Sequence, residues 1–346
     1  MRKWLLLICL LLLLPGNVLA MEETAPQPPK DAMELLPQEQ HTFGEDLWTV
    51  ISSALSALTP EIAASMKICG ALFGVCMLSS LTSAIPGKTL DTVHLVGILV
   101  VCGLLLETTG AMFQSASETI TELSQYGKML IPVLCAAMAS SGGFHTSTTL
   151  YIGTAIFDTV LTSLISSWLI PMVSIMLILS VASAFTGEKI LSSLREFLKW
   201  LVTWLLKMIL YIFTGYIGIT GVVSGNADAA AMKVTKLSMS GMVPVVGGIL
   251  SDASEAVIVG AGVVKNALGT YGLLAVIAIW ISPFLKIGAQ YLLLKLTTAL
   301  CEMFDAKPVN ELMKSFTGAM GLLLGMTGAV CVMLLISTVC FMKGVA

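Results

Sequence analysis

Long hydrophobic runs separated by short polar stretches dominate the chain. A helix needs about 20 mostly apolar residues to cross the roughly 30 Å hydrocarbon core of a bilayer. Runs near that length lie at residues 66–85, 93–113, 201–223 and 316–342. The run at 150–185 is long enough for two helices, with a bend near Ser166, Ser167 and Pro171. The pattern predicts an all-α, polytopic integral membrane protein with about seven to nine spans.

Two segments do not fit a simple spanning helix. Residues 130–143 are too short to cross a bilayer, which favours a half-helix. Residues 241–298 form an apolar run with a proline and paired glycines near its start, which favours a discontinuous or re-entrant segment. The predicted helix breaks are Pro132, Pro171, Pro244, Gly247, Gly248 and Pro283.

The same 241–298 segment carries two carboxylates, Asp252 and Glu255, which share one helical face at i and i+3. A charge exposed to hydrocarbon is costly, so such groups face the protein interior or water. The predicted pathway or polar-interior residues are Asp252, Glu255, Lys265, Asn266, Asp158 and Lys286. The alternative is a buried polar cluster that only fixes helix packing. For Asp158 the alternative is a helix end at the membrane interface.

The amino-terminal part differs in composition from the rest. Residues 1–20 have a basic start, an apolar core and a small-residue end, which predicts a secretory signal peptide cut after Ala20. Residues 21–64 are predicted to form a flexible extracytoplasmic leader followed by an amphipathic helix at 43–64. Residues 65–346 form the predicted multi-span membrane domain.

Charge and glycine positions add two expectations. The amphipathic, basic-leaning loop at 187–199 and the charged loop at 301–314 are both predicted to be cytoplasmic, following the positive-inside rule. Glycines at helical spacing let neighbouring helices approach closely. The predicted helix-packing glycines are Gly70, Gly74, Gly215, Gly221, Gly321 and Gly325.

A shift of 112 positions places Pro132 on Pro244, Trp168 on Trp280 and Pro171 on Pro283. This register predicts an internal repeat with units at about 66–167 and 168–300, followed by a final span at 316–342. Corresponding breaks in two repeats indicate a site between them. The alternative is coincidence in a sequence built from few residue types.

Composition excludes several classes of protein. Charged residues make up 11% of the chain, whereas soluble domains have about 25%. The net charge of -3 and the scattered basic residues give no nucleic-acid-binding patch. Most of the eight cysteines lie in apolar runs and the three histidines are far apart, so neither a metal nor another cofactor is expected. No HExxH or GxSxG motif occurs, so the protein is not expected to be an enzyme.

Residues 243–272 resemble the stage III sporulation protein AE family. The likeness is carried by Pro-Val-Val-Gly at 244–247, Ser-Asp-Ala at 251–253, and Lys265–Asn266 followed by spaced glycines, whereas residues 21–60 have no evident counterpart. The resemblance implies a multi-pass subunit of the channel complex that links mother cell and forespore, located in the mother-cell-derived membrane. It implies as partners other subunits of that complex, including ring-forming proteins and a secretion-type ATPase, and a forespore protein. It supplies no catalytic residues.

Two functions remain open from the sequence. One is this channel or secretion subunit, with broken segments that line or gate a passage. The other is a stand-alone, ion-coupled secondary transporter that uses intramembrane carboxylates.

Overall fold

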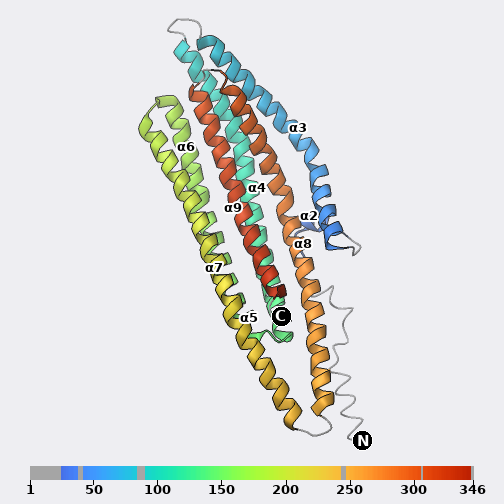
Figure 1. Ribbon diagram of the computed structural model, residues 1–346. Coiled ribbons are helices and arrows are strands. Elements are labelled where there is room, and N and C mark those ends of the chain that lie inside the picture. The colour runs from blue at the N-terminus through green and yellow to red at the C-terminus, as the bar shows by residue number, and fades with distance from the viewer. Residues whose placement is uncertain (1–24, 38–41, 84–89, 243–246, 305–306, 344–346) are drawn as a thin grey trace.

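The computed structural model describes residues 25–37, 42–83, 90–242, 247–304 and 307–343, with backbone alone in 81–83, 90–94, 221–242 and 247–259. These residues form helices and no strand: α2 (Lys30–Met33), α3 (Phe43–Ser83), α4 (Leu90–Ser140), α5 (Phe144–Leu164), the π-helix η1 (Ile165–Leu169), α6 (Ile170–Thr186), α7 (Lys189–Met242), α8 (Gly247–Cys301) and α9 (Lys307–Lys343). Long antiparallel helices run along one axis (Figure 1). The all-α prediction is therefore confirmed for this part of the chain.

Within the described ranges, six helical segments are long and apolar enough to cross a membrane: Phe43–Ser80, Leu95–Ser140, Phe144–Thr186, Lys189–Thr220, Gly260–Cys301 and Lys307–Lys343. This number is lower than the predicted seven to nine. The reason is that segments predicted as separate elements join into single helices, each of which is much longer than one bilayer crossing requires.

Helices α3 and α4 show this joining most clearly. The predicted amphipathic helix and the first predicted span are one helix, α3, with Pro60 inside it. The predicted half-helix at 130–143 is the last part of α4, which continues through the polar stretch after Phe113 and through Pro132. In that stretch Ile120 and Leu123 are buried while Glu118 and Glu122 are exposed. An amphipathic face, rather than a loop, therefore explains the polar residues.

The bend predicted near Ser166, Ser167 and Pro171 coincides with the π-helix η1, and Pro171 follows it in the first turn of α6. A π-helix inserts an extra residue into a helical turn. Helices α5 and α6 therefore form one continuous helical segment with a local irregularity at η1. Helix α6 ends at Thr186, and Gly187 after it adopts a left-handed conformation (φ 71°). Helix α7 begins two residues later, at Lys189. The segment predicted as a loop at 187–199 is therefore mostly the first turns of α7.

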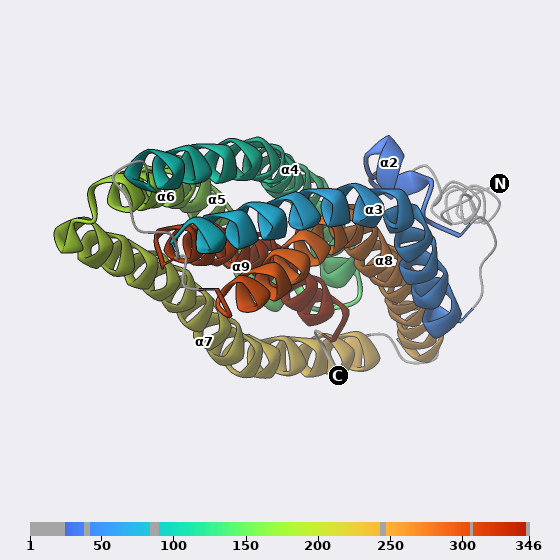
Figure 2. The same cartoon turned by 90° about the horizontal axis from the view of Figure 1, so that it is seen from above.

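Helix α9 lies in the middle of the bundle and packs against α4, α5, α6, α7 and α8 (Figures 1 and 2). Most of its circumference is buried, including Phe316, Met320, Met326, Val330 and Leu334, while Val332 lies on a strip that stays exposed. A helix that is buried on most sides is typical of the core of a large bundle. The core of the molecule therefore follows α9, although the most distinctive sequence is that of α8.

Part of the predicted flexible leader is ordered. Residues 30–33 form the short helix α2, and Ala32 is buried in the main hydrophobic core. Leu35 and Leu36 also pack against this core. The apolar residues of the leader thus hold it on the bundle, beside α8. The predicted signal peptide at 1–20 lies outside the described residues.

Candidate functional site

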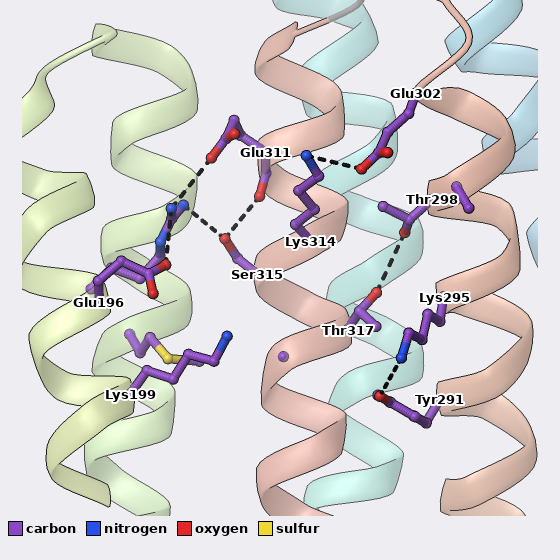
Figure 3. Close-up of a pocket in the computed structure, with 14 residues that line it drawn as sticks. Glu196, Lys199, Tyr291, Lys295, Thr298, Glu302, Glu311, Lys314, Ser315 and Thr317 are labelled. Atoms are coloured by element: carbon purple, nitrogen blue, oxygen red, sulfur yellow. Dashed lines mark hydrogen bonds and ion pairs between the residues drawn. The ribbon is translucent and has the colours of Figure 1, made fainter. Parts of the chain in front are cut away.

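A cavity of about 600 Å³ lies where α6, α7, α8 and α9 meet, near the end of the bundle that carries the α6–α7 turn (Figure 3). We call it the charged pocket. Helix α9 forms its floor, and α7 and α8 form its walls (Figure 3). The charged side chains that line it are Arg195, Glu196, Lys199, Lys295, Glu302, Glu311 and Lys314.

Helical spacing brings these side chains to one place. Arg195 and Lys199 are separated by one turn on α7, as are Tyr291 and Lys295 on α8. The connection between α8 and α9 is fixed by Asn310, whose side-chain amide donates hydrogen bonds to the carbonyl oxygens of Cys301 (3.1 Å) and Phe304 (3.3 Å). This connection keeps the start of α9 beside the end of α8, and so sets the geometry of the pocket.

The carboxylates of the charged pocket are all paired. Arg195 is only 9% exposed, and its guanidinium donates to the Ser315 hydroxyl at 2.9 Å. Its Nη2 lies 3.3 Å from both Glu196 and Glu311. Lys314 pairs with Glu302 at 2.9 Å. These contacts tie α7 to α9 and α9 to the end of α8.

Two cations of the pocket have no carboxylate partner among the described residues. Lys199 extends from the α7 wall, and Lys295 donates a hydrogen bond to the Tyr291 hydroxyl at 3.2 Å from the α8 wall. In Figure 3 both ammonium groups point toward the centre of the pocket, across α9. The pocket therefore has four cations and three carboxylates in its lining, and its unpaired charge is positive.

The predicted pathway residues do not meet at this pocket. Asp252 and Glu255 belong to the first turns of α8, but their side chains lie outside the described residues. Lys265 is buried on α8, and its neighbour Asn266 is exposed. Lys286 pairs with Glu61 of α3. The polar residues that the sequence grouped together are thus spread over the length of the bundle.

Asp158 is the most deeply buried carboxylate among the described side chains, at 2% exposed. Its Oδ2 accepts a hydrogen bond from the Ser124 hydroxyl of α4 at 2.9 Å. Its Oδ1 has no hydrogen-bond partner in the described structure, and neither has the buried hydroxyl of Thr154, one turn away. The interior position differs from the helix-end alternative, and the contact joins α5 to α4.

A smaller cavity of about 230 Å³ lies between α2, α4 and α8. Lys286 and Pro283 line it, together with the acidic residues Asp31, Glu118 and Glu122. Residues of the ordered part of the leader, including Ala32 and Leu35, form one side of this cavity.

The predicted helix breaks have different settings. Pro132 and Pro283 lie inside α4 and α8, which continue through them. Pro244 lies outside the described residues, between the end of α7 and the start of α8 at Gly247–Gly248. For the predicted repeat, Trp168 is exposed on η1, whereas Trp280 stacks on Phe284 at 4.0 Å. The repeat itself stays a prediction.

The predicted packing glycines also differ from one another. A Cβ at Gly321 would lie 3.4 Å from the Tyr291 ring, and one at Gly325 would lie 3.6 Å from Leu206. At Gly70, Gly74 and Gly215 no neighbouring atom lies within 4 Å of that position. The side chains around Gly221 are outside the described residues.

Sequence reasoning did not single out the charged pocket. The available signal is the pair of charged segments 187–199 and 301–314, which the positive-inside rule predicts on one side of the membrane. The structure brings residues of these segments within ion-pair distance through Arg195 and Glu311. What the sequence could not give was the contribution of α8 through Tyr291 and Lys295.

Together, the long apolar helices and the buried α9 define a multi-pass, all-α membrane protein. The chain belongs to the stage III sporulation protein AE family, whose sequence model matches residues 30–344. It is therefore a membrane protein involved in sporulation.

One relative illustrates the match. Stage III sporulation protein AE of Bacillus subtilis (strain 168) is 26% identical over 279 residues, which cover 78% of this chain and 68% of the relative. The family match begins at residue 30, so the part of the leader from 30 to 60 does have a counterpart in the family, contrary to the expectation from the motif alone. No solved structure matches the chain.

Proposed function

We propose that this protein is a membrane subunit of the channel complex that links mother cell and forespore during sporulation. Its place is the mother-cell-derived membrane around the forespore. Membership of the family supports this proposal, as do the six helices of membrane-crossing length among the described residues. The family is not known for an enzymatic activity, and the role proposed here requires none.

The observation that carries the proposal is the packed axis of the bundle. Helix α9 fills the centre with buried side chains, and neither of the two cavities above is lined by Asp158 or Lys265. A water-filled passage needs polar groups along its length. The passage is therefore formed between this protein and other subunits, or between copies of it, and the single bundle acts as one wall.

The orientation follows from charge. Lys189, Arg195, Lys199, Lys307 and Lys314 all belong to the segments at the charged-pocket end of the bundle. By the positive-inside rule this end faces the mother-cell cytoplasm. Ring-forming subunits and a forespore partner then meet the opposite end, and a secretion-type ATPase meets the charged end.

Two measurements test the subunit role. Affinity purification of the tagged full-length chain from sporulating cells, after cross-linking, is expected to recover other membrane and ring-forming subunits of one complex. The purified chain alone in liposomes is expected to give no solute or ion flux above that of empty liposomes, because its axis is filled.

Flux by the protein alone contradicts the proposal. If that flux were lost in Asp158→Asn and kept in Glu107→Gln, which removes an exposed carboxylate of α4, the stand-alone ion-coupled transporter would be the correct function. Recovery of the chain without other subunits would count against the channel complex in the same way.

A further inference from the structure

Among the residues that the structure describes, the charged pocket has an excess of positive charge without a neutralising carboxylate. Arg195 and Lys314 pair with Glu196, Glu302 and Glu311, which leaves Lys199 and Lys295 on opposite walls without a carboxylate. Two ammonium groups that face one cavity repel each other, and an anion between them relieves that repulsion. The geometry of the pocket therefore favours a bound anion.

The floor and one wall add features that suit a phosphate group. Gly318 leaves the floor without a side chain, so that the Lys199 ammonium lies 3.7 Å from the position of the missing Cβ. The Tyr291 hydroxyl accepts the hydrogen bond of Lys295, and its own proton remains available to an anionic oxygen. Two ammonium groups and a hydroxyl together supply the charged and neutral donors that phosphate oxygens accept.

The helices that form the pocket walls carry exposed apolar and aromatic side chains outside the pocket. On α7, Phe197, Trp200 and Trp204 are exposed on the side of the helix away from the pocket, with ring centroids 6.0 Å and 6.2 Å apart in succession. On α8, Leu292 and Leu296 are exposed on either side of Lys295 in sequence. Aromatic side chains of this kind mark the membrane–water interface. The pocket thus lies at the depth where lipid headgroups meet acyl chains.

We propose that the charged pocket binds the phosphate of an anionic phospholipid headgroup, with the acyl chains against the exposed leucines of α8. Basic pockets between membrane helices are suited to anionic headgroups. A free phosphate ion has the same charge chemistry but makes no use of the apolar surroundings. An acidic peptide is also anionic, but it does not need a site at the membrane interface. This binding is independent of the channel role.

Lipid retention by the purified full-length protein tests the proposal. The protein in detergent is mixed with vesicles of equal phosphatidylglycerol and phosphatidylcholine content, and bound lipid is measured by native mass spectrometry. Wild-type protein is expected to retain more phosphatidylglycerol than phosphatidylcholine. The Lys199→Gln/Lys295→Gln variant is expected to lose affinity by about five-fold for each lysine, or roughly 25-fold in all.

A matched control removes the same charge elsewhere. Lys67→Gln/Lys207→Gln changes two exposed lysines of α3 and α7 that do not line the pocket, and its phosphatidylglycerol affinity is expected to stay within about twofold of wild type. An equal loss in both double variants would overturn the proposal, since it would show only general attraction to a basic surface.

A third variant separates shape from charge. Gly318→Leu fills the floor of the pocket while every charge remains, and it is expected to abolish the preference for phosphatidylglycerol. Unchanged lipid retention in Gly318→Leu would show that the headgroup does not enter the pocket. Circular dichroism of each variant checks that the helices are intact.

Phosphorus NMR with inorganic phosphate separates the two sources of the anion. Phosphate binding that depends on Lys199 and Lys295, without any preference for phosphatidylglycerol, would overturn the lipid assignment and identify a free-anion site. If phosphatidylglycerol were displaced only by a glutamate-rich peptide, and not by excess lipid vesicles, the lipid assignment would also be overturned. The pocket would then be a binding site for an acidic protein segment.

Discussion

Two pairs of glycines in this protein have the same spacing and different surroundings. Gly321 and Gly325 of α9 face Tyr291 and Leu206, whereas Gly70 and Gly74 of α3 have no neighbouring atom within 4 Å of a Cβ position. We call them the packed pair and the open pair. The spacing of small residues permits close helix approach. The spacing alone does not determine whether the neighbouring helix belongs to the same chain or to another protein.

The difference suggests a role for the open pair in the proposed channel complex, as a contact surface for another subunit. A glycine inside a helix destabilises it by roughly 0.5–1 kcal/mol relative to alanine. The packed pair offsets this cost through contacts inside the bundle. For the open pair no such contact exists within the described chain, and a helix of another subunit is the contact that the proposed function supplies.

The largest expected effect is at the packed pair. Gly321→Leu/Gly325→Leu inserts two large side chains against Tyr291 and Leu206, and overpacking costs about 1–3 kcal/mol at each site. We expect a lower midpoint of thermal unfolding in detergent and reduced accumulation in the membrane. A double variant as stable as wild type would show that α9 does not pack on α7 and α8 as described.

A second, smaller effect is expected at Gly153 of α5, another packed glycine. A Cβ there would overlap the ring of Tyr216, whose hydroxyl donates to the Thr149 carbonyl oxygen at 2.8 Å. Gly153→Ala therefore displaces the ring and breaks that hydrogen bond, at a cost of about 1–3 kcal/mol. Thermal unfolding measures the loss.

The matched control for Gly153→Ala is Gly215→Ala on α7, where no atom lies within 4 Å of the new Cβ. This control is expected to keep or slightly raise stability through helix propensity, by at most about 1 kcal/mol. Equal destabilisation by both substitutions would remove the distinction between packed and open glycines.

The smallest effect on folding is expected at the open pair. Gly70→Leu/Gly74→Leu meets no neighbour in the chain, so the unfolding midpoint is expected not to fall. The same variant is expected to lose cross-links to other subunits in sporulating cells, because bulky residues prevent close helix approach. Cross-linking yields equal to wild type, at equal protein levels, would mean that this face of α3 contacts only lipid.

The fold class followed from hydrophobic pattern alone, since runs of this length admit only helices in a bilayer. The joining of segments does not follow from it, because polar residues after Phe113 resemble the end of a span. Their helical period, with Ile120 and Leu123 inward and Glu118 and Glu122 outward, was the available sign of a continuous α4. Helix ends inferred from polarity thus fail where an amphipathic stretch follows an apolar one.

The candidate site could be predicted only in part. The two charged segments of α7 and α9 were recognisable, and so was their common side of the membrane. The positions of Tyr291 and Lys295 opposite Lys199 depend on how α8 packs on α9, which no local pattern encodes. The sequence indicates Asp158 as an intramembrane charge, but its contact with Ser124 depends on the packing of α5 on α4.

The 51 residues of α4 give it a reach of about 77 Å, more than twice the thickness of a hydrocarbon layer. An upright helix of that length overhangs the membrane surface by tens of ångströms. The overhang is continuous with the crossing segment, and so a push or pull on its outer tip is transmitted along one unbroken helix into the bilayer. In the proposed setting between two facing membranes, such an overhang would extend the protein from its own membrane toward the other.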